Sequence, residues 1–282
     1  MTRAWISATL RLLRPAALVA SCLAALGCAG FAAYEVVEAP GNQLFGATLV
    51  RGAPTVREVA LTYDDGPNPP YTDRILDVLR SEHVPATFFL VGRAVVAYPQ
   101  TVRRIVREGH VIGNHSWDHA HLIVETNAAV RTELSRTDAA IERVAGVRPD
   151  LMRPPFGARD FAVIDQAHAL GYRVVMWSVP LAADWEQPGD ATIAARVLAH
   201  ITDGSIIVLH DGNRGILCGR GRPVPPRVCD REQDVAATRT IIERLRTRGY
   251  RFVTIPQLIA AAGSGRGHAY RLPRRSMNPS WW

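Results

Sequence analysis

The sequence contains no lysine, so arginine supplies all 33 of its Lys/Arg charges, which we attribute to genome composition. It also has no fixed-length repeat and no low-complexity block, which argues against a repeat architecture. Neither end carries an acid: residues 1–34 hold three arginines and residues 263–282 hold four. These seven charges account for the whole formal net charge of +7. The rest of the chain is therefore balanced, which argues against a nucleic-acid groove in the folded domain.

Cysteine is scarce, with four residues in a chain of 282. Cys22 and Cys28 lie in the N-terminal segment, which leaves Cys218 and Cys229 for the folded part. In an oxidising compartment these two could close a small loop as a disulfide. Two free thiols in a surface loop are the alternative.

The first 34 residues combine a positive flank with a long apolar run. Three arginines precede position 15, and the stretch 15–34 has no charge. This pattern indicates an export signal. Because the run is long enough to span a bilayer and no A-x-A cleavage motif is evident, residues 1–34 are expected to be a cleaved signal peptide or an N-terminal membrane anchor. The protein is then exported, either secreted or anchored outside the cytoplasm, and residues 35–54 form a connector.

Strand and helix patterns alternate about seven times between residues 55 and 262. The apolar stretches expected to form strands are EVALTY (58–63), ATFFLV (86–91), HVIGN (110–114), DLMR (150–153), RVVMW (173–177), SIIVL (205–209) and RFVTI (251–255). Segments of helical period are 72–81, 101–108, 128–144, 161–170, 192–201, 235–248 and 256–262. Asn127 is expected to cap the third helix. This order predicts an α/β fold with a parallel sheet, open or closed into a barrel. Residues 263–282 are expected to be a basic flexible tail.

Polar side chains follow most of the predicted strands. The residues in these positions are Asp64, Asp65, His115, Arg153, Asp184, Trp185, His210 and Asp211. In parallel α/β folds the carboxyl ends of the strands share one face, and that face holds the active site. We therefore expect these side chains to converge.

The motif HSWDH favours a metal site. His115 and His119 are four residues apart, so on a helical turn both rings face the same way. Two histidines and a carboxylate suit zinc in a hydrolase or Fe(II) in an oxygenase. One of Asp64 and Asp65 would then be a ligand and the other a general base, with the metal offsetting their repulsion. Without the histidine pair, D-D-G-P would indicate no more than a charged turn.

Five ordered motifs, LTYDDGP, HSWDH, RPPFG, DW and VLHDG, resemble those of the polysaccharide deacetylases, the NodB-homology domain of carbohydrate esterase family four. The resemblance spans roughly residues 55–262. It implies a distorted (β/α) barrel of about seven strands that binds a divalent metal, usually zinc. It also implies an acetylated polysaccharide as the substrate, deacetylated at nitrogen in amino-sugar polymers or at oxygen in xylan.

The resemblance assigns roles around the metal. It implies that Asp65, His115 and His119 are the metal ligands. Asp64 is the base that deprotonates the attacking water, and Arg153 pairs with Asp64 and keeps it ionised.

It assigns further roles around the substrate. His210 is implied to be the general acid that protonates the leaving amine, oriented by Asp184. Trp185 and Leu209 are implied to shape the pocket for the acetyl methyl group. The backbone N–H of Phe156 is implied to help stabilise the oxyanion.

The sequence departs from the family pattern at two points. Tyr63 stands where the family usually has Phe, and the fourth motif, commonly D-x-x-D-W, lacks its first aspartate in WSVPLAADW. Two other functions therefore stay open: a small-molecule amidohydrolase on the same fold, and a glycan-binding module without activity. An iron oxygenase is disfavoured because it would not explain His210.

Overall fold

The computed structural model describes residues 35–179, 182–218 and 224–264, together with positions 21, 23, 25–27, 29–30 and 32. Most of the predicted export segment and nearly all of the predicted basic tail therefore lie outside the described residues. Among the helices that are described, none is long and apolar enough to cross a membrane.

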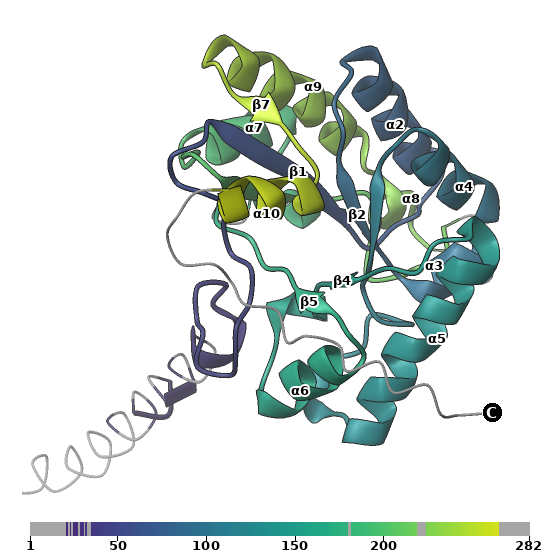
Figure 1. Ribbon diagram of the computed structural model, residues 1–282, viewed down its shortest axis with the longest axis vertical. Coiled ribbons are helices and arrows are strands. Elements are labelled where there is room, and N and C mark those ends of the chain that lie inside the picture. Colours follow the sequence, from purple (N-terminus) through teal and green to yellow (C-terminus); the bar gives the residue numbers. More distant parts are fainter. Residues whose placement is uncertain are drawn as a thin grey trace, which may run out of the picture.

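The centre of the molecule is a parallel sheet of seven strands (Figure 1). The strands are β1 (Glu58–Asp64), β2 (Thr87–Leu90), β3 (Val111–Asn114), β4 (Leu151–Met152), β5 (Arg173–Val174), β6 (Ser205–His210) and β7 (Arg251–Phe252). Their order is β5-β4-β3-β2-β1-β6, and β7 pairs with the start of β1. The prediction of seven strands in a parallel sheet is confirmed.

An irregular segment bridges the two ends of the sheet. The N–H of Leu49 donates to the carbonyl of Val174 (2.8 Å), and the N–H of Met176 donates back to Leu49 (2.7 Å). Three residues later, the N–H of Gly52 donates to the carbonyl of Gly204 (2.8 Å), just before β6. The segment thus lies between β5 and β6 and closes the sheet into a distorted barrel. It belongs to the stretch that the sequence suggested was a connector.

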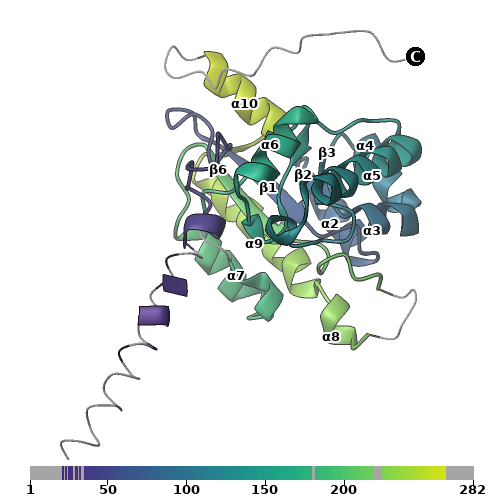
Figure 2. The same cartoon turned by 90° about the horizontal axis from the view of Figure 1, so that it is seen from below.

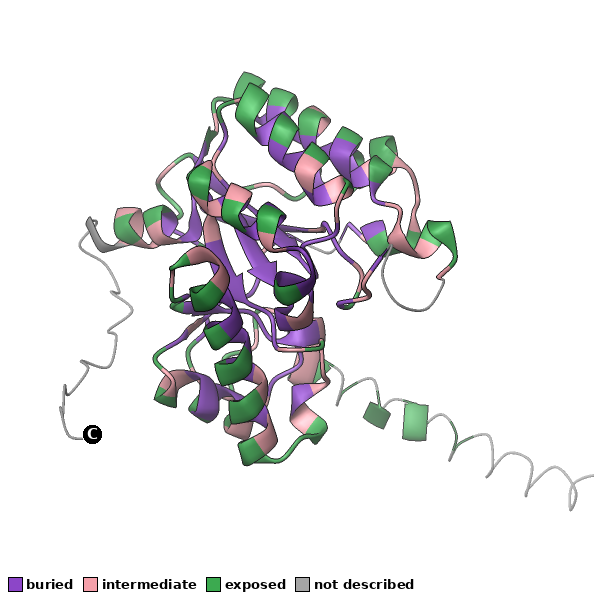
Figure 3. Cartoon of the chain, turned by 90° about the vertical axis from the view of Figure 1, so that its right-hand side faces the viewer, coloured by how far each residue is buried: buried purple, intermediate pink, exposed green. Residues whose placement is uncertain are grey.

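Helices surround the strands, with buried inner faces and exposed outer faces (Figure 3). The predicted helices are present as α2 (Tyr71–Ser81), α4 (Pro99–Arg107), α5 (Asn127–Ala145), α6 (Phe161–Ala169), α7 (Asp190–Leu198), α9 (Glu232–Thr247) and α10 (Ile255–Ser264). Figure 2 shows α4 and α5 together on one flank, and α7 and α9 together on another. The expected cap Asn127 is wrong by one position: the side chain of Thr126 accepts from the N–H of Ala129.

Several short elements escaped the sequence patterns. They are α3 (Gly92–Ala97), α8 (Pro226–Cys229) and the 3-10 helices η1 (Leu122–Val124), η2 (Pro155–Gly157) and η3 (Asp184–Glu186). The α3 sequence, GRAVVA, is almost entirely apolar and mostly buried, so it shows no polar face by which a helix could be recognised.

The strands separate two hydrophobic layers because successive side chains of a strand point to opposite faces. In β1, Leu61 and Tyr63 pack towards helices in one cluster. Ala60 packs into the other cluster, inside the barrel, together with Ile206 and Val208 of β6. The even-numbered residues of β1 and β6 therefore face the interior, where Asp64 and His210 end their strands.

The predicted disulfide is confirmed: Cys218 and Cys229 are bonded across 11 residues of chain. The carbonyl of Cys229 accepts a hydrogen bond from the side-chain amide of Asn68 (2.9 Å), in the turn after β1. The carbonyl of Cys218 accepts one from the hydroxyl of Tyr98. The bridge therefore fixes the loop after β6 against the turn that carries the Asp64–Asp65 pair.

Candidate active site

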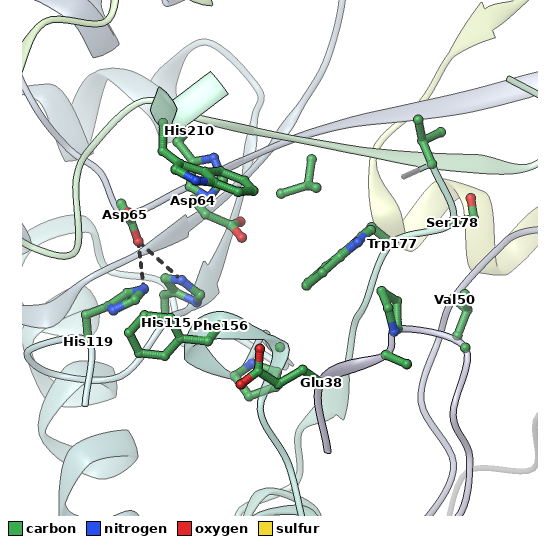
Figure 4. Close-up of a pocket in the computed structure, with 18 of the residues that line it drawn as sticks. Glu38, Val50, Asp64, Asp65, His115, His119, Phe156, Trp177, Ser178 and His210 are labelled. Atoms are coloured by element: carbon green, nitrogen blue, oxygen red, sulfur yellow. Dashed lines mark ion pairs between the residues drawn. The ribbon is translucent and has the colours of Figure 1, made fainter. Parts of the chain in front are cut away.

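Asp65, His115 and His119 meet at the carboxyl ends of β1 and β3 (Figure 4). Asp65 Oδ1 lies 3.4 Å from Nε2 of His115 and 3.1 Å from Nε2 of His119. One ligand atom from each residue lies within 4.8 Å of the other two. The structure therefore brings together the three residues that the sequence assigned to the metal.

Hydrogen bonds to the backbone orient His115 and Asp65. Nδ1–H of His115 donates to the carbonyl of Arg153 (2.7 Å), which leaves Nε2 as a free lone pair. Asp65 Oδ2 accepts from the backbone N–H of Arg214 (2.6 Å). Burial alone would raise the pKa of Asp65, but the neighbouring imidazoles, His119 foremost, lower it well below its usual range. Asp65 is thus an ionised ligand.

These residues fit a divalent metal. Asp65 Oδ1 is buried with no hydrogen-bond donor, a costly state for a carboxylate oxygen unless a cation binds it. Two imidazole nitrogens and one carboxylate oxygen leave coordination positions open for water and substrate, as in catalytic zinc sites. The same donor set also occurs in non-haem Fe(II) sites, so the ligands alone leave the metal's identity open.

The backbone around the ligands is strained. Asp65, Ser116, His119 and Phe156 all have positive φ, between 62° and 76°. Such conformations cost about 1–3 kcal/mol each for residues other than glycine, and they cluster at functional sites. Asn114 offsets part of this cost because its side-chain oxygen accepts from the N–H of Ser116 (2.9 Å). The strain turns the ligand side chains towards one point.

Asp64 forms an ion pair with Arg153 beside the metal ligands. Nη1 of Arg153 lies 2.7 Å from Oδ1 of Asp64 and also donates to the hydroxyl of Thr62 (2.8 Å). Nε and Nη2 donate to the carbonyls of Val175 (3.2 Å) and Met176 (3.0 Å). The guanidinium is fully buried, so its orientation is fixed. Asp64 itself lines the cavity.

His210 forms a second ion pair, with Asp184 of η3. Nδ1–H of His210 donates to the carboxylate of Asp184 (2.9 Å), and the backbone N–H of His210 donates to the same group (2.7 Å). Burial alone would lower the pKa of His210, but the Asp184 carboxylate raises it to about 9. The ring is therefore protonated at neutral pH, and a proton is available at Nε2, next to Trp185, whose ring meets it edge-on at 5.5 Å.

A second carboxyl group behind this pair was not found from the sequence. Asp234 is buried in α9 and interacts electrostatically with Asp184. Burial and the charge of Asp184 raise the pKa of Asp234 well above its usual range, so Asp234 is the protonated member of the pair. Asp211 is also buried beside His210, and burial raises its pKa to about 7. Asp211 was expected here from its place after β6, but no sequence pattern signals the approach of Asp234 to Asp184, because α9 meets η3 only through the tertiary fold.

Asp64, the three candidate metal ligands and His210 open into one cavity of about 640 Å³. Seven of the predicted site residues line it: Asp64, Asp65, His115, His119, Phe156, Trp185 and His210. The assignment of Leu209 to the pocket is wrong. Leu209 is fully buried in the helix-side cluster, and Val208 lines the cavity in its place. Counting back from His210 by two, the period of a strand, would have found Val208.

The cavity has walls that the motifs did not reveal. Trp177 lines it, as do Asn213 and Arg214 from the loop after β6. Glu35, Glu38 and residues 39–41 line it from the stretch that the sequence suggested was a connector. Phe156 lies on this side: its ring packs edge-on against His119 (4.5 Å) and stacks on His121 (4.7 Å).

Comparison with known proteins points to one group of enzymes. The family model described as polysaccharide deacetylase matches residues 51–175. A chitooligosaccharide deacetylase of Bradyrhizobium sp. (strain ANU 289) is 38% identical over 207 residues, which cover 72% of this chain and 90% of that protein. The crystal structure of the Bc1960 peptidoglycan N-acetylglucosamine deacetylase superposes with a TM-score of 0.67 at 35% identity and covers 75% of this chain and 92% of that one.

Some relatives are much longer. The peptidoglycan-N-acetylglucosamine deacetylase PgdA of Listeria monocytogenes is 34% identical over 206 residues, which cover 73% of this chain. The match spans 40% of the Listeria protein.

Proposed function

The chain belongs to the polysaccharide deacetylase family, and we propose that it is a metal-dependent hydrolase that removes acetyl groups from a cell-envelope or extracellular polysaccharide. Peptidoglycan and chitin-like oligomers, whose amino sugars are N-acetylated, are the substrates that its relatives' names favour. One observation carries the proposal: Asp64 and His210 line the same cavity as the metal-ligand triad, and each is held by a buried partner, Arg153 and Asp184 respectively.

Asp65, His115 and His119 would hold the metal, and we propose zinc because two histidines and one carboxylate form a typical catalytic zinc site. When bound, such an ion supplies Lewis-acid polarisation of the acetyl carbonyl and of the attacking water. The Nδ1 hydrogen bond of His115 to a backbone carbonyl would orient its ring for this role.

Asp64 would act as the general base. It would take the proton of the attacking water on the carboxylate that lines the cavity, while Arg153 fixes its position through Oδ1. Because Arg153 is anchored by the hydroxyl of Thr62 and two backbone carbonyls, it would keep Asp64 oriented through the cycle.

His210 would act as the general acid. Its Nδ1–H is held by Asp184, so the Nε2 proton faces the cavity and would pass to the leaving amine nitrogen as the C–N bond breaks. Asp184 would stabilise the imidazolium between turnovers. Asp234 would in turn hold Asp184 in place through its own proton.

The acetyl group would lie in the apolar part of the cavity. Trp185 and Val208 would contact its methyl group, and both line the cavity next to His210. The backbone N–H of Phe156, whose residue has φ of 62°, would donate to the oxyanion that forms on the carbonyl oxygen.

We also propose that the protein acts outside the cytoplasm, secreted or anchored through residues 1–34. The positive flank and uncharged apolar run of that segment support this. Fusing residues 1–34 to a reporter enzyme that is active only after export tests it. A reporter that stays inactive would contradict export.

The test of the function is acetate release by purified protein from chitin oligomers, peptidoglycan and acetylated xylan, before and after treatment with chelator and then zinc. We expect release that stops with chelator, returns with zinc and identifies the substrate. The His119→Ala variant should lose both bound metal and acetate release. Binding of glycan without acetate from any polymer would favour a binding module, and turnover restricted to small cyclic amides would favour an amidohydrolase.

A further inference from the structure

One wall of the cavity comes from a segment that the family match does not include. Residues 35–41 precede position 51, where the match begins, yet five of them line the cavity together with the metal ligands. Figure 4 shows the carboxylate of Glu38 at the edge of this cavity, on the side of Phe156 and apart from His210. The segment therefore contributes to the cavity from outside the matched range.

A buried arginine holds this wall in place. Arg159 is fully buried, and its guanidinium donates to the carbonyls of Ala39 (2.7 Å), Asn42 (2.7 Å) and Gly157 (2.9 Å). Its own N–H donates to the carbonyl of Val37 (3.2 Å). Within the part of the chain that the structure describes, Arg159 forms no ion pair, so its donors serve to fix backbone. The residues on both sides of Glu38 are thereby anchored to the barrel.

Glu38 itself has little compensation for its charge. Within the described ranges, its one ion-pair contact is with Nε2 of His121, at 4.0 Å and conditional on protonation of that ring. The Glu38 side chain is 23% exposed, so water solvates it in part. The His121 ring stacks on Phe156, which packs against the ligand His119. Glu38 is thus separated from the metal site by two side chains in contact, in a position suited to a sugar next to the reacting one.

We propose that Glu38 is a specificity-determining residue that binds the ammonium group of an already deacetylated amino sugar adjacent to the acetamide being hydrolysed. This inference rests on the proposed function. The reaction converts each acetamide into an amine, whose protonated form is a cation with three hydrogen-bond donors, and a nearby carboxylate such as Glu38 favours that protonated form. A partly buried carboxylate recognises such a group more strongly than a neutral acetamide. The enzyme therefore prefers partly deacetylated chains.

The arginines of the wall do not cancel this effect at Glu38, and Glu35 adds a second carboxylate to the same wall. The guanidinium of Arg214 lies over the Phe156 ring, 5.3 Å from its centre, and its backbone is tied to Asp65. Arg51 donates to the hydroxyl of Thr202, next to β6. We therefore expect the rate to depend on the position of the free amine in the oligosaccharide. The total positive charge of the substrate should not determine it.

The experiment compares two tetrasaccharides: one fully N-acetylated, and one with a single free amine next to an acetylated unit. Initial rates of acetate release by the zinc-loaded full chain give kcat/KM for each. We expect the wild type to favour the amine-bearing substrate by about tenfold, a preference that falls with added salt. Glu38→Gln should bring the ratio of the two values close to one, and Glu38→Asp should keep part of the preference.

Glu125→Gln is the matched control, because it makes the same change at an exposed glutamate away from the cavity lining. Calorimetric binding of a fully deacetylated glucosamine tetramer to wild type and to Glu38→Gln gives a readout that is independent of catalysis. If Glu38→Gln binds the tetramer more weakly than the wild type and Glu125→Gln does not, the role of Glu38 is supported, whether or not acetate is released. Absence of acetate release would refute the deacetylase function and leave the binding result standing. Equal preference and equal tetramer binding in wild type and Glu38→Gln would overturn the role of Glu38.

Discussion

Two neighbouring ion pairs, Asp64–Arg153 and His210–Asp184, border the active-site cavity, and they differ in the kind of cation. Asp64 and His210 are register partners at the ends of β1 and β6, so the two pairs start from adjacent strands. Asp64 is paired with Arg153, which is fully buried and does not give up its proton under working conditions. Asp184 is paired with His210, whose pKa is raised to about 9 and whose ring borders the cavity.

This difference separates a fixed charge from a transferable proton. The Asp64–Arg153 pair keeps one carboxylate oriented, which suits a group that receives a proton from water. The His210–Asp184 pair keeps a proton on a ring that can release it, which suits a group that protonates the leaving amine. Breaking each pair should therefore affect different steps of the proposed reaction.

Asp64→Asn should have the largest effect on activity. It removes the proposed base while Asp65, His115 and His119 stay in place, so acetate release should fall by about a thousandfold or more. Metal content, measured by elemental analysis, should stay near that of the wild type. A variant that lost its metal instead would show that Asp64 acts as a ligand.

His210→Ala should come next, and its effect should depend on the leaving group. Amide hydrolysis needs a proton on the departing nitrogen, so acetate release from an N-acetylated oligosaccharide should fall by about a hundredfold or more. An acetyl ester of a nitrophenol needs no such proton, and its hydrolysis should be much less affected. In Asp64→Asn both substrates should be affected. An equal loss on both substrates in His210→Ala would refute its role as the acid.

Asp184→Asn should move the alkaline limit of activity to lower pH. The proposed acid must be protonated, so kcat falls as pH rises through the pKa of His210, which Asp184 raises to about 9. Without that carboxylate, burial remains and lowers the pKa. On the alkaline limb, each pH unit of displacement means about tenfold less protonated acid.

The measurement for Asp184→Asn is kcat against pH for the metal-loaded enzyme. Asp190→Asn, at the exposed first residue of α7, is the control for an equal change of charge. If the alkaline limb of Asp184→Asn matched that of the wild type, Asp184 would not be the group that keeps His210 protonated.

The sequence predicted the strands and the residues at their ends because both depend on local pattern. Short apolar runs identified all seven strands, even though β4 and β5 are two residues long. Parallel topology then requires that residues after β1, β3, β4 and β6 share one face, which is why Asp65, His115 and Arg153 were found.

What the sequence could not predict depends on contacts between distant segments. Residues 35–38 of the wall are helical, but no sequence pattern places residues 35–41 against the cavity, and the carbonyl contacts of Arg159 that hold them are invisible in a sequence. The pairing of Asp234 with Asp184 likewise requires that α9 pack behind η3. These features arise from tertiary packing, which local patterns do not encode.

The positions of Val208 and Leu209, by contrast, could have been predicted from the sequence. Because side chains alternate along a strand, only one of the two can face the cavity. Val208 lines the cavity and Leu209 packs towards the helices. Val208→Ala should lower kcat/KM by a few-fold, since it removes about 1 kcal/mol of contact with the acetyl methyl group. Leu209→Ala should leave kcat/KM of the folded enzyme nearly unchanged but lower the free energy of unfolding by about 2–5 kcal/mol.

Urea unfolding together with initial rates separates the two effects for this last pair of variants. Propionylated substrate sharpens the test, because the space opened by Val208→Ala should accept the additional methylene, whereas Leu209→Ala opens space on the other side of β6, away from the substrate. A gain of propionyl turnover in Leu209→Ala but not in Val208→Ala would mean that the strand faces the cavity with its odd-numbered residues. That result would contradict the position of His210 as well, since His210 shares the face of Val208.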